Sequence, residues 1–213
     1  MTDGRLIAEN VTIARGGRRL IDGLSFTVGA GEALVLTGPN GVGKTTLLRT
    51  LAGLVAPAAG TIRLDGVPDD ATPGDCAHYV SHANAVKAGL TVRENASFWA
   101  RFLGDGKASI EDALDAVGLA DIASVPAGYL SAGQKRRLGL ARLLLTDRPL
   151  WLLDEPTVSL DSASQAWLTR AIQNHLDNGG LLVAATHAPL GLATARTLAL
   201  AAPAPVQGED VTS

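Results

Sequence analysis

The sequence predicts an α/β protein with a mainly parallel central sheet. Three short apolar runs, at Ala33–Thr37, Leu150–Leu153 and Leu181–Ala185, are typical of strands that are buried on both faces. Helical patterns lie between these runs, as in proteins whose parallel strands are joined by helices. The composition agrees, because only 4% of the residues are aromatic while glycine and alanine are abundant, which suits helices packed closely on a buried sheet.

A small antiparallel β-subdomain is expected near the N-terminus. Leu6–Ile13 and Leu24–Val28 alternate partly between apolar and polar residues, and the Gly16-Gly17 pair between them is a turn signal. Partial alternation of this kind is typical of antiparallel strands with one face in water.

The middle of the chain is expected to be helical. Thr91, followed three residues later by Glu94, forms a capping box that predicts a helix to about Leu103, and another helix is expected to begin near Ser109. Since no buried-strand signal occurs here, residues from about 84 to 135 are predicted to form a helical insertion between sheet strands.

Length and composition favour one globular domain. With 213 residues, 46% of them hydrophobic, we expect a single domain over residues 1–201 and a frayed tail over 202–213.

Cys76 is the only cysteine, which fits a reducing cytoplasm. The polar start Met1–Arg5 lacks a signal-peptide core, and no stretch approaches the ~20 apolar residues of a membrane span. A net charge of -3 argues against nucleic acid as a main partner.

The strongest functional motif follows the first buried run. It reads Gly38-Pro39-Asn40-Gly41-Val42-Gly43-Lys44-Thr45-Thr46 and fits the phosphate-loop pattern GxxxxGK[ST] between a strand and a helix. The glycines let backbone N–H groups surround phosphate oxygens at the helix N-terminus. Lys44 supplies a charge to the β- and γ-phosphates of ATP, and the Thr45 hydroxyl can bind Mg²⁺.

Two neighbouring carboxylates follow the second buried run. Asp154 and Glu155 lie in LWLLDEP, at the edge where a doubly wound sheet binds ligands. Neighbouring side chains at a strand end point in different directions. We therefore expect Asp154 to hold the Mg²⁺ shell and Glu155 to reach the water that attacks the γ-phosphate. An isolated Asp-Glu pair is more often a solvated turn, and the upstream phosphate loop favours the catalytic interpretation.

A second anion-binding position is predicted before the helical run that ends near Leu145. Ser131, Ala132, Gly133 and Gln134 lie at the start of that run, where the helix dipole favours an anion. One phosphate loop holds one nucleotide, so we expect the nucleotide of a second copy of the chain to dock here. Taken alone, these residues also fit an ordinary capped helix.

His187 is a candidate for contact with the γ-phosphate. It follows the third buried run, which places its imidazole at the same sheet edge as Asp154 and Glu155. His78 and His175 do not end such a strand. We expect His78 to pack in the interior and His175 to be solvated.

In combination, these segments resemble the ATP-binding cassette of ABC transporters over nearly the whole chain. The resemblance rests on GPNGVGKT, LSAGQ, LLDEP, Ser159–Asp161 and His187, in this order. It implies a P-loop NTPase fold and a head-to-tail dimer, with each ATP between the phosphate loop of one protomer and LSAGQ of the other. It also matches Asp161 to the interprotomer D-loop, Glu155 to the catalytic base and His187 to the switch histidine.

The chain is more specifically similar to the haem exporter ATPases of cytochrome c biogenesis. The similarity lies in YLSAGQKRRLGLARL, in PLWLLDEPTVSLD and in the spacing of Ser81, His82 and Lys87. It implies a peripheral position on the cytoplasmic face of the bacterial inner membrane, with membrane permease subunits as partners. ATP hydrolysis would there support haem export or the release of a haem-loaded chaperone.

Three positions depart from the usual cassette. Ala132 replaces a glycine of the signature. His82 stands where a glutamine usually contacts Mg²⁺, which makes His82 a candidate ligand in its place. Arg15 stands where an aromatic residue usually stacks on adenine. Its guanidinium plane can stack instead, and a solvated loop arginine is an equally good interpretation.

An aromatic cluster lies on the helix that Thr91 caps. Phe98 and Phe102 are four residues apart on one face and Trp99 is beside them, and such stripes are usually core, so we expect at least two of the three to be buried. The family resemblance gives a second interpretation, in which part of the cluster contacts a cytoplasmic helix of the membrane partner.

Other functions fit the sequence less well. The runner-up is an ABC ATPase for another substrate, because nothing in a cassette touches cargo. Cassette proteins that act on ribosomes or DNA usually carry two cassettes or a long coiled-coil insertion, which this sequence lacks. A nucleotide-gated scaffold that does not hydrolyse ATP would not need Glu155.

Overall fold

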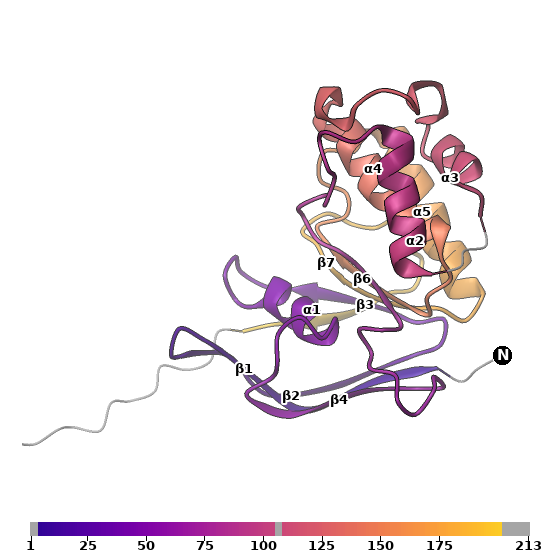
Figure 1. Cartoon of the computed structure of the whole chain (residues 1–213). Coiled ribbons are helices and arrows are strands. Elements are labelled where there is room, and N and C mark those ends of the chain that lie inside the picture. Colours follow the sequence, from indigo (N-terminus) through magenta and orange to yellow (C-terminus); the bar gives the residue numbers. More distant parts are fainter. Residues whose placement is uncertain (1–3, 105–107, 202–213) are drawn as a thin grey trace, which may run out of the picture.

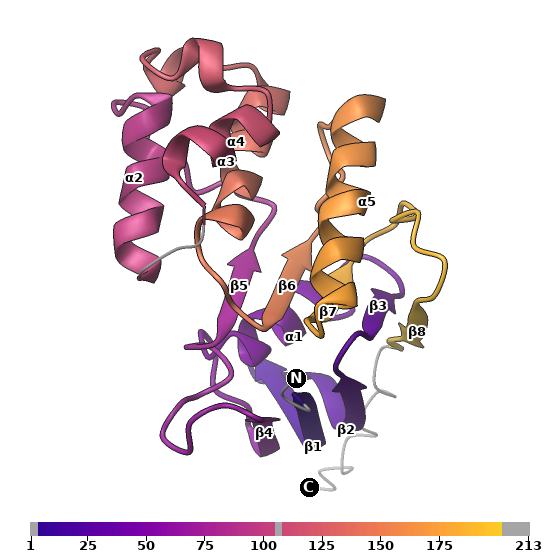
Figure 2. The same ribbon diagram turned by 90° about the vertical axis from the view of Figure 1, so that its right-hand side faces the viewer.

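A computed structural model describes residues 4–104 and 108–201. Its strands form two separate sheets, and its helices gather mainly on one side of the larger sheet (Figures 1 and 2). The predicted tail at 202–213 lies outside the described residues. None of the helices in the described ranges has the length and apolar character needed to cross a membrane.

The smaller sheet is antiparallel, with the order β2-β1-β4. Its strands are β1 (Arg5–Arg15), β2 (Arg18–Gly29) and β4 (Ala59–Asp65). The predicted hairpin of two strands is therefore confirmed, although both strands are longer than expected. The third strand was not predicted, because β4 has a single fully buried position, Leu64, and so shows little apolar pattern.

The larger sheet is parallel throughout, with the order β5-β6-β7-β3-β8. Its strands are β3 (Ala33–Thr37), β5 (Ala77–Val80), β6 (Leu150–Asp154), β7 (Leu181–Ala185) and β8 (Arg196–Ala199). The three apolar runs are its three inner strands, and β6 and β7 are buried at every position. The predicted α/β fold with a parallel core and an antiparallel subdomain is confirmed.

The helices occupy two positions relative to the sheets. Helix α1 (Lys44–Leu51) lies in the core between the two sheets, where Leu47 and Leu48 are fully buried. The others are α2 (Val92–Leu103), α3 (Ile110–Ala116), α4 (Ala132–Leu145) and α5 (Ser162–Asp177), with short 3₁₀ turns at Ala120–Ile122 and Ala127–Tyr129. Helices α2, α3 and α4 share an apolar cluster of their own. As expected, Thr91 caps α2 through a capping box and Ser109 caps α3.

The aromatic cluster on α2 is more exposed than expected. Phe98 is 36% exposed and Phe102 is 69% exposed, and their rings stack on each other with centroids 5.9 Å apart. The expectation that at least two of the three aromatic residues are core is wrong. The reason is the phase of the helix, because Val92, Asn95 and Ala96 form the buried face of α2 instead.

The two histidines outside the candidate site are both buried to some degree. His78 is 1% exposed, which confirms its packing role. His175 stacks on Trp151 with ring centroids 4.1 Å apart, so the expected solvated position is wrong. Burial lowers the pKa of each imidazole to about 4.

Candidate active site

The phosphate loop connects the end of β3 to the start of α1. Gly43 is the N-cap of α1 with φ 114°, and no side chain caps this helix. A side chain at Gly38, where φ is 132°, would collide with the Leu200 carbonyl. Glycine is therefore required at both positions. In the described part of the chain, no side chain accepts from the backbone N–H groups of the first turn of α1, as an anion site needs.

The ammonium of Lys44 is folded into this loop. The side chain is 8% exposed, and Nζ donates hydrogen bonds to the carbonyls of Gly38 at 2.7 Å and Pro39 at 3.1 Å. Among the residues that the structure describes, no carboxylate pairs with this positive charge. The loop thus combines a helix N-terminus with a buried cation, both of which favour phosphate.

Thr45 and Asp154 join the loop to the end of β6. The Thr45 hydroxyl lies 3.0 and 3.2 Å from the two carboxylate oxygens of Asp154, which is only 3% exposed. His82 Nδ1 lies 3.8 Å from the same carboxylate. In the described ranges there is no cluster of three or more His, Cys, Asp or Glu residues that could hold a metal alone. A hydroxyl and one carboxylate fit Mg²⁺ that is bound together with substrate phosphates.

Glu155, His187 and Asn40 come together from three segments. The backbone N–H of His187 lies 3.4 Å from Glu155 Oε2, and His187 Nε2 lies 3.7 Å from Glu155 Oε1. His187 Nε2 also lies 3.0 Å from Asn40 Oδ1 in the phosphate loop. The ends of β6 and β7 therefore bring a carboxylate and an imidazole to the loop, as parallel strands do at one sheet edge.

The backbone of Glu155 is strained. Its φ is 46°, and its N–H donates to the Ala185 carbonyl at 2.8 Å. A left-handed conformation costs a residue with a Cβ about 1–2 kcal/mol, so neighbouring interactions must hold it. Such strain at a candidate catalytic carboxylate suggests that its direction matters.

The residues of the second predicted anion position form the start of α4. Ser131 Oγ accepts from the N–H of Gln134 at 3.2 Å, and Gln134 Oε1 accepts from the N–H of Ser131 at 2.8 Å. Ala132 begins the helix, and a Cβ on Gly133 would lie 2.9 Å from the Ser159 carbonyl. Within one chain, the side chains of Ser131 and Gln134 therefore each accept a hydrogen bond from the other residue's backbone N–H.

Two further candidates lie elsewhere in the described chain. Asp161 is the N-cap of α5, and its Oδ1 accepts from the N–H of Ser164 at 2.8 Å. Hydrogen bonds from Ser164 lower the pKa of this carboxyl. Arg15 is exposed at the end of β1, paired in register with Arg18. Neither side chain forms a hydrogen bond to the phosphate loop within residues 4–104 and 108–201.

One buried cation beside the carboxylates was not predicted. Arg136 in α4 is 2% exposed and donates to the carbonyls of Asp154, Glu155 and Pro156. The sequence contains one indication that Arg136 is buried, because Arg136 shares a helical face with the buried Leu140 and Leu143.

Comparison with known proteins agrees with this geometry. The ABC transporter family matches residues 21–158. The chain belongs to the ABC transporter family. Among its curated relatives is the "Cytochrome c biogenesis ATP-binding export protein CcmA" of Rhodopseudomonas palustris (strain BisB5), which is 53% identical over 88% of this chain and 94% of that protein. The protein of the same name from Rhizobium meliloti (strain 1021) is 51% identical over 91% of this ABC ATPase and 96% of its own length.

Solved structures share the fold of this ABC ATPase. A "Putative ABC transporter (ATP-binding protein)" from Pyrococcus furiosus superposes with a TM-score of 0.78 over 92% of this chain and 97% of that one, at 26% identity. The "ATP-binding cassette MJ0796 bound to ADP and Pi", a dimeric post-hydrolysis state, has a TM-score of 0.74 over 86% of this chain and 88% of that one, at 24% identity.

Proposed function

We propose that this ABC ATPase is the ATP-hydrolysing subunit of a complex that exports haem, or releases a haem-loaded chaperone, in cytochrome c biogenesis. One observation carries the enzymatic part, namely that Lys44, Asp154 and Glu155 converge on one edge of the parallel sheet. The names of relatives that are about 50% identical over most of the chain support the haem part.

The phosphate loop would hold the phosphates of ATP. Residues 38–46 supply backbone N–H groups and the Lys44 ammonium, which can leave its two carbonyls for phosphate oxygens. Arg15, at the exposed hairpin, would stack on the adenine. Mg²⁺, when bound, neutralises charge on the phosphate oxygens, and Thr45 and Asp154 are the residues that would hold it, with His82 at the rim.

Glu155 would act as the general base. Its carboxylate would accept a proton from the water that attacks the γ-phosphate. His187 would contact the γ-phosphate from the end of β7, and its contact with Asn40 in the phosphate loop supports this role. The two carboxylates have different neighbours, because that of Asp154 contacts Thr45 and that of Glu155 contacts His187.

The Glu155→Gln variant tests the proposed chemistry. We expect it to bind ATP normally and to lose about 10²- to 10⁴-fold in turnover, the usual contribution of a positioned general base. The same substitution at the exposed Glu9 is the matched control and should leave turnover unchanged. Hydrolysis by Glu155→Gln at the rate of the control would refute the assignment.

A second copy of the chain would complete each ATP site. We propose that Ser131, Ala132, Gly133 and Gln134 contact the nucleotide held by the other protomer, with Asp161 at the interface. The dimeric state of the MJ0796 cassette supports this arrangement for a protein of the same fold.

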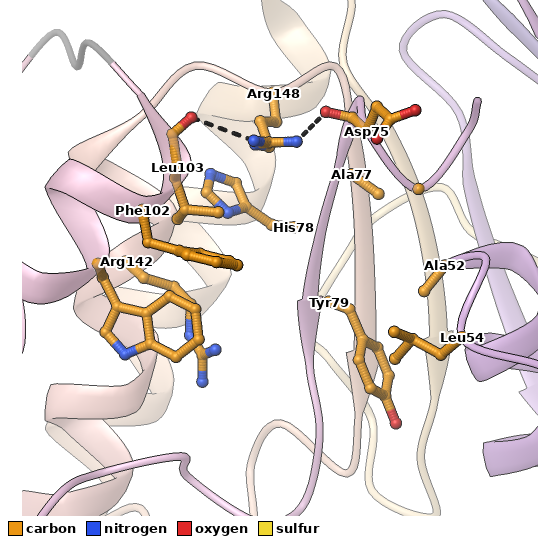
Figure 3. Close-up of a pocket in the computed structure, with 12 residues that line it drawn as sticks. Ala52, Leu54, Asp75, Ala77, His78, Tyr79, Phe102, Leu103, Arg142 and Arg148 are labelled. Atoms are coloured by element: carbon orange, nitrogen blue, oxygen red, sulfur yellow. Dashed lines mark hydrogen bonds between the residues drawn. The ribbon is translucent and has the colours of Figure 1, made fainter. Parts of the chain in front are cut away.

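A cleft beside α2 is the proposed docking site for a membrane permease subunit. It has a volume of about 420 Å³ and lies between the end of α1 and strand β5 on one side and the C-terminal half of α2 on the other (Figure 3). Leu54 and Phe102, 64% and 69% exposed, are apolar residues on its two walls. The subunit would thereby be held at the cytoplasmic face of the inner membrane.

Co-expression with the cognate permease tests this docking. We expect the wild-type chain to sediment with membranes, and Phe102→Asp or Leu54→Asp to release it, because a charge buried against an apolar partner is costly. Ala14→Asp, an exposed position on β1, is the control. Full membrane retention of both cleft variants, with ATP binding intact, would place docking elsewhere.

A further inference from the structure

Arg136 uses all five of its N–H donors inside the protein. Nε donates to the Pro156 carbonyl at 3.2 Å, and Nη2 donates to the carbonyls of Asp154 at 3.2 Å and Glu155 at 2.7 Å. Nη1 donates to the Ser81 carbonyl at 2.8 Å and to Asn84 Oδ1 at 3.1 Å. A guanidinium has five N–H groups in a planar fork, so this arrangement leaves no donor unpaired.

Three of these acceptors are consecutive backbone carbonyls around Glu155. Carbonyls of successive residues in an extended strand point in alternating directions, so they do not converge on one cation. Here they converge on Arg136, and the chain leaves the extended conformation at Glu155, where φ is 46°. The guanidinium therefore stabilises the strained backbone that directs the Glu155 carboxylate.

The same side chain connects three parts of the site. Arg136 lies in the second turn of α4, five residues after Ser131. Ser81, one of its acceptors, directly precedes His82. The start of α4, the Glu155 segment and the His82 segment thus meet at one buried side chain. Burial lowers the pKa of the Arg136 guanidinium, and the negative charges of Asp154 and Glu155 offset part of this effect.

We propose that Arg136 is a positioning residue of the ATPase reaction, which fixes the Glu155 backbone relative to the start of α4 and the His82 segment. The proposal rests on the proposed function of Glu155 as the base. Arg136 itself does not touch the substrate, since all its donors are bonded to protein. If contact with a nucleotide displaces the start of α4, the displacement would reach the Glu155 segment through this side chain.

The chain offers a matched control in the next residue. Arg137 also donates to two backbone carbonyls, those of Val117 at 2.8 Å and Gly118 at 3.2 Å, but these lie at the end of α3. Arg137→Gln therefore removes an arginine with carbonyl partners from the same helix without touching the Glu155 segment. Arg136→Lys keeps the charge, but an ammonium has three donors in a different geometry and cannot serve five acceptors.

Steady-state kinetics of purified full-length variants test the proposal. We expect Arg136→Gln to retain ATP affinity and to lose about 10²-fold in kcat, the size of effect that a misplacement of about 1 Å produces. Arg136→Lys should lose less, and Arg137→Gln should stay near wild type. A kcat of Arg136→Gln equal to that of Arg137→Gln would overturn the proposal.

A double-variant cycle separates positioning from general destabilisation. If Arg136 acts through Glu155, adding Arg136→Gln to Glu155→Gln should cause no further loss in single-turnover hydrolysis. An equal loss in both backgrounds would overturn the proposal. Should Arg136→Gln fail to fold, as judged by ATP binding, the same cycle is run with Arg136→Lys. If Glu155→Gln alone hydrolyses ATP at the wild-type rate, the proposed function of Glu155 fails first, whatever Arg136 does.

Discussion

Helices α1 and α4 both present the positive end of a helix dipole at their N-termini, but the two N-termini differ in whether their backbone N–H groups are already bonded to a side chain. Helix α1 begins after Gly43 without a side-chain cap, and Lys44 lies inside the loop. Helix α4 begins with a closed capping box, in which Ser131 and Gln134 satisfy each other's N–H groups. The first start can receive phosphate within a single chain, whereas the second holds a pair of internal hydrogen bonds that a nucleotide would rearrange or extend.

Helix α2 separates the effect of the capping box from the effect of charge. It carries the same capping box as α4, with Thr91 and Glu94 in the places of Ser131 and Gln134. The third helical residue is acidic in α2 and neutral in α4, and the first turns of both α1 and α4 lack acidic residues. A carboxylate would repel phosphate, so the absence of acid, rather than the capping box, distinguishes the proposed nucleotide positions.

Removal of the cation at the α1 start is expected to have the largest effect. Lys44→Ala should weaken ATP binding by one to two orders of magnitude in Kd, because a charged hydrogen bond contributes about 1.5–3 kcal/mol. Titration with a fluorescent ATP analogue measures this. Lys135→Ala removes a half-buried lysine from the α4 start, where Nζ donates to the Gly128 carbonyl at 3.3 Å, and should leave binding unchanged. Equal Kd values for the two variants would contradict the comparison.

A mixture of two inactive variants tests whether the α4 start works in trans. Ser131→Arg should block this start while leaving the phosphate loop intact, and Lys44→Ala does the reverse. Heterodimers of the two contain one intact composite site and should recover part of the ATPase activity if the sites act independently.

A structure of the ATP-bound Glu155→Gln dimer decides the case in which no activity is recovered. Ser131 in contact with the γ-phosphate of the opposite protomer would support the composite site. Ser131 beyond contact distance of that phosphate would disprove it, and α4 would then be an ordinary capped helix.

The phosphate loop and the inner strands could be predicted from the sequence, whereas the role of Arg136 could not. The phosphate loop was predictable because GxxxxGK[ST] specifies glycine, lysine and hydroxyl positions directly. The three inner strands were predictable because burial on both faces makes them apolar, whereas the edge strand β8 has no fully buried residue and shows no such pattern. The role of Arg136 depends on backbone carbonyls, which every sequence contains, so no residue pattern marks them.

Exchanging the third helical residues of α4 and α2 is expected to have the smallest effect and makes the sharpest test. Gln134→Glu keeps the capping box, since glutamate accepts the same N–H, and the helix dipole should stabilise the fold by about 0.3–1 kcal/mol. Glu94→Gln at α2 should lower Tm slightly, because hydrogen bonds from Thr91 favour the ionised form of Glu94 and lower its pKa. Thermal unfolding measures both changes.

Turnover should respond to only one member of this pair. The new carboxylate at residue 134 would face the phosphates of the opposite protomer, so Gln134→Glu should reduce ATPase activity while Tm stays equal or rises. Glu94→Gln should leave activity unchanged. A fall in activity without a fall in Tm cannot come from a damaged helix, and it would therefore assign the loss to the added charge. Unchanged activity of Gln134→Glu would mean that no phosphate approaches the start of α4, and the contrast between α4 and α2 would carry no functional meaning.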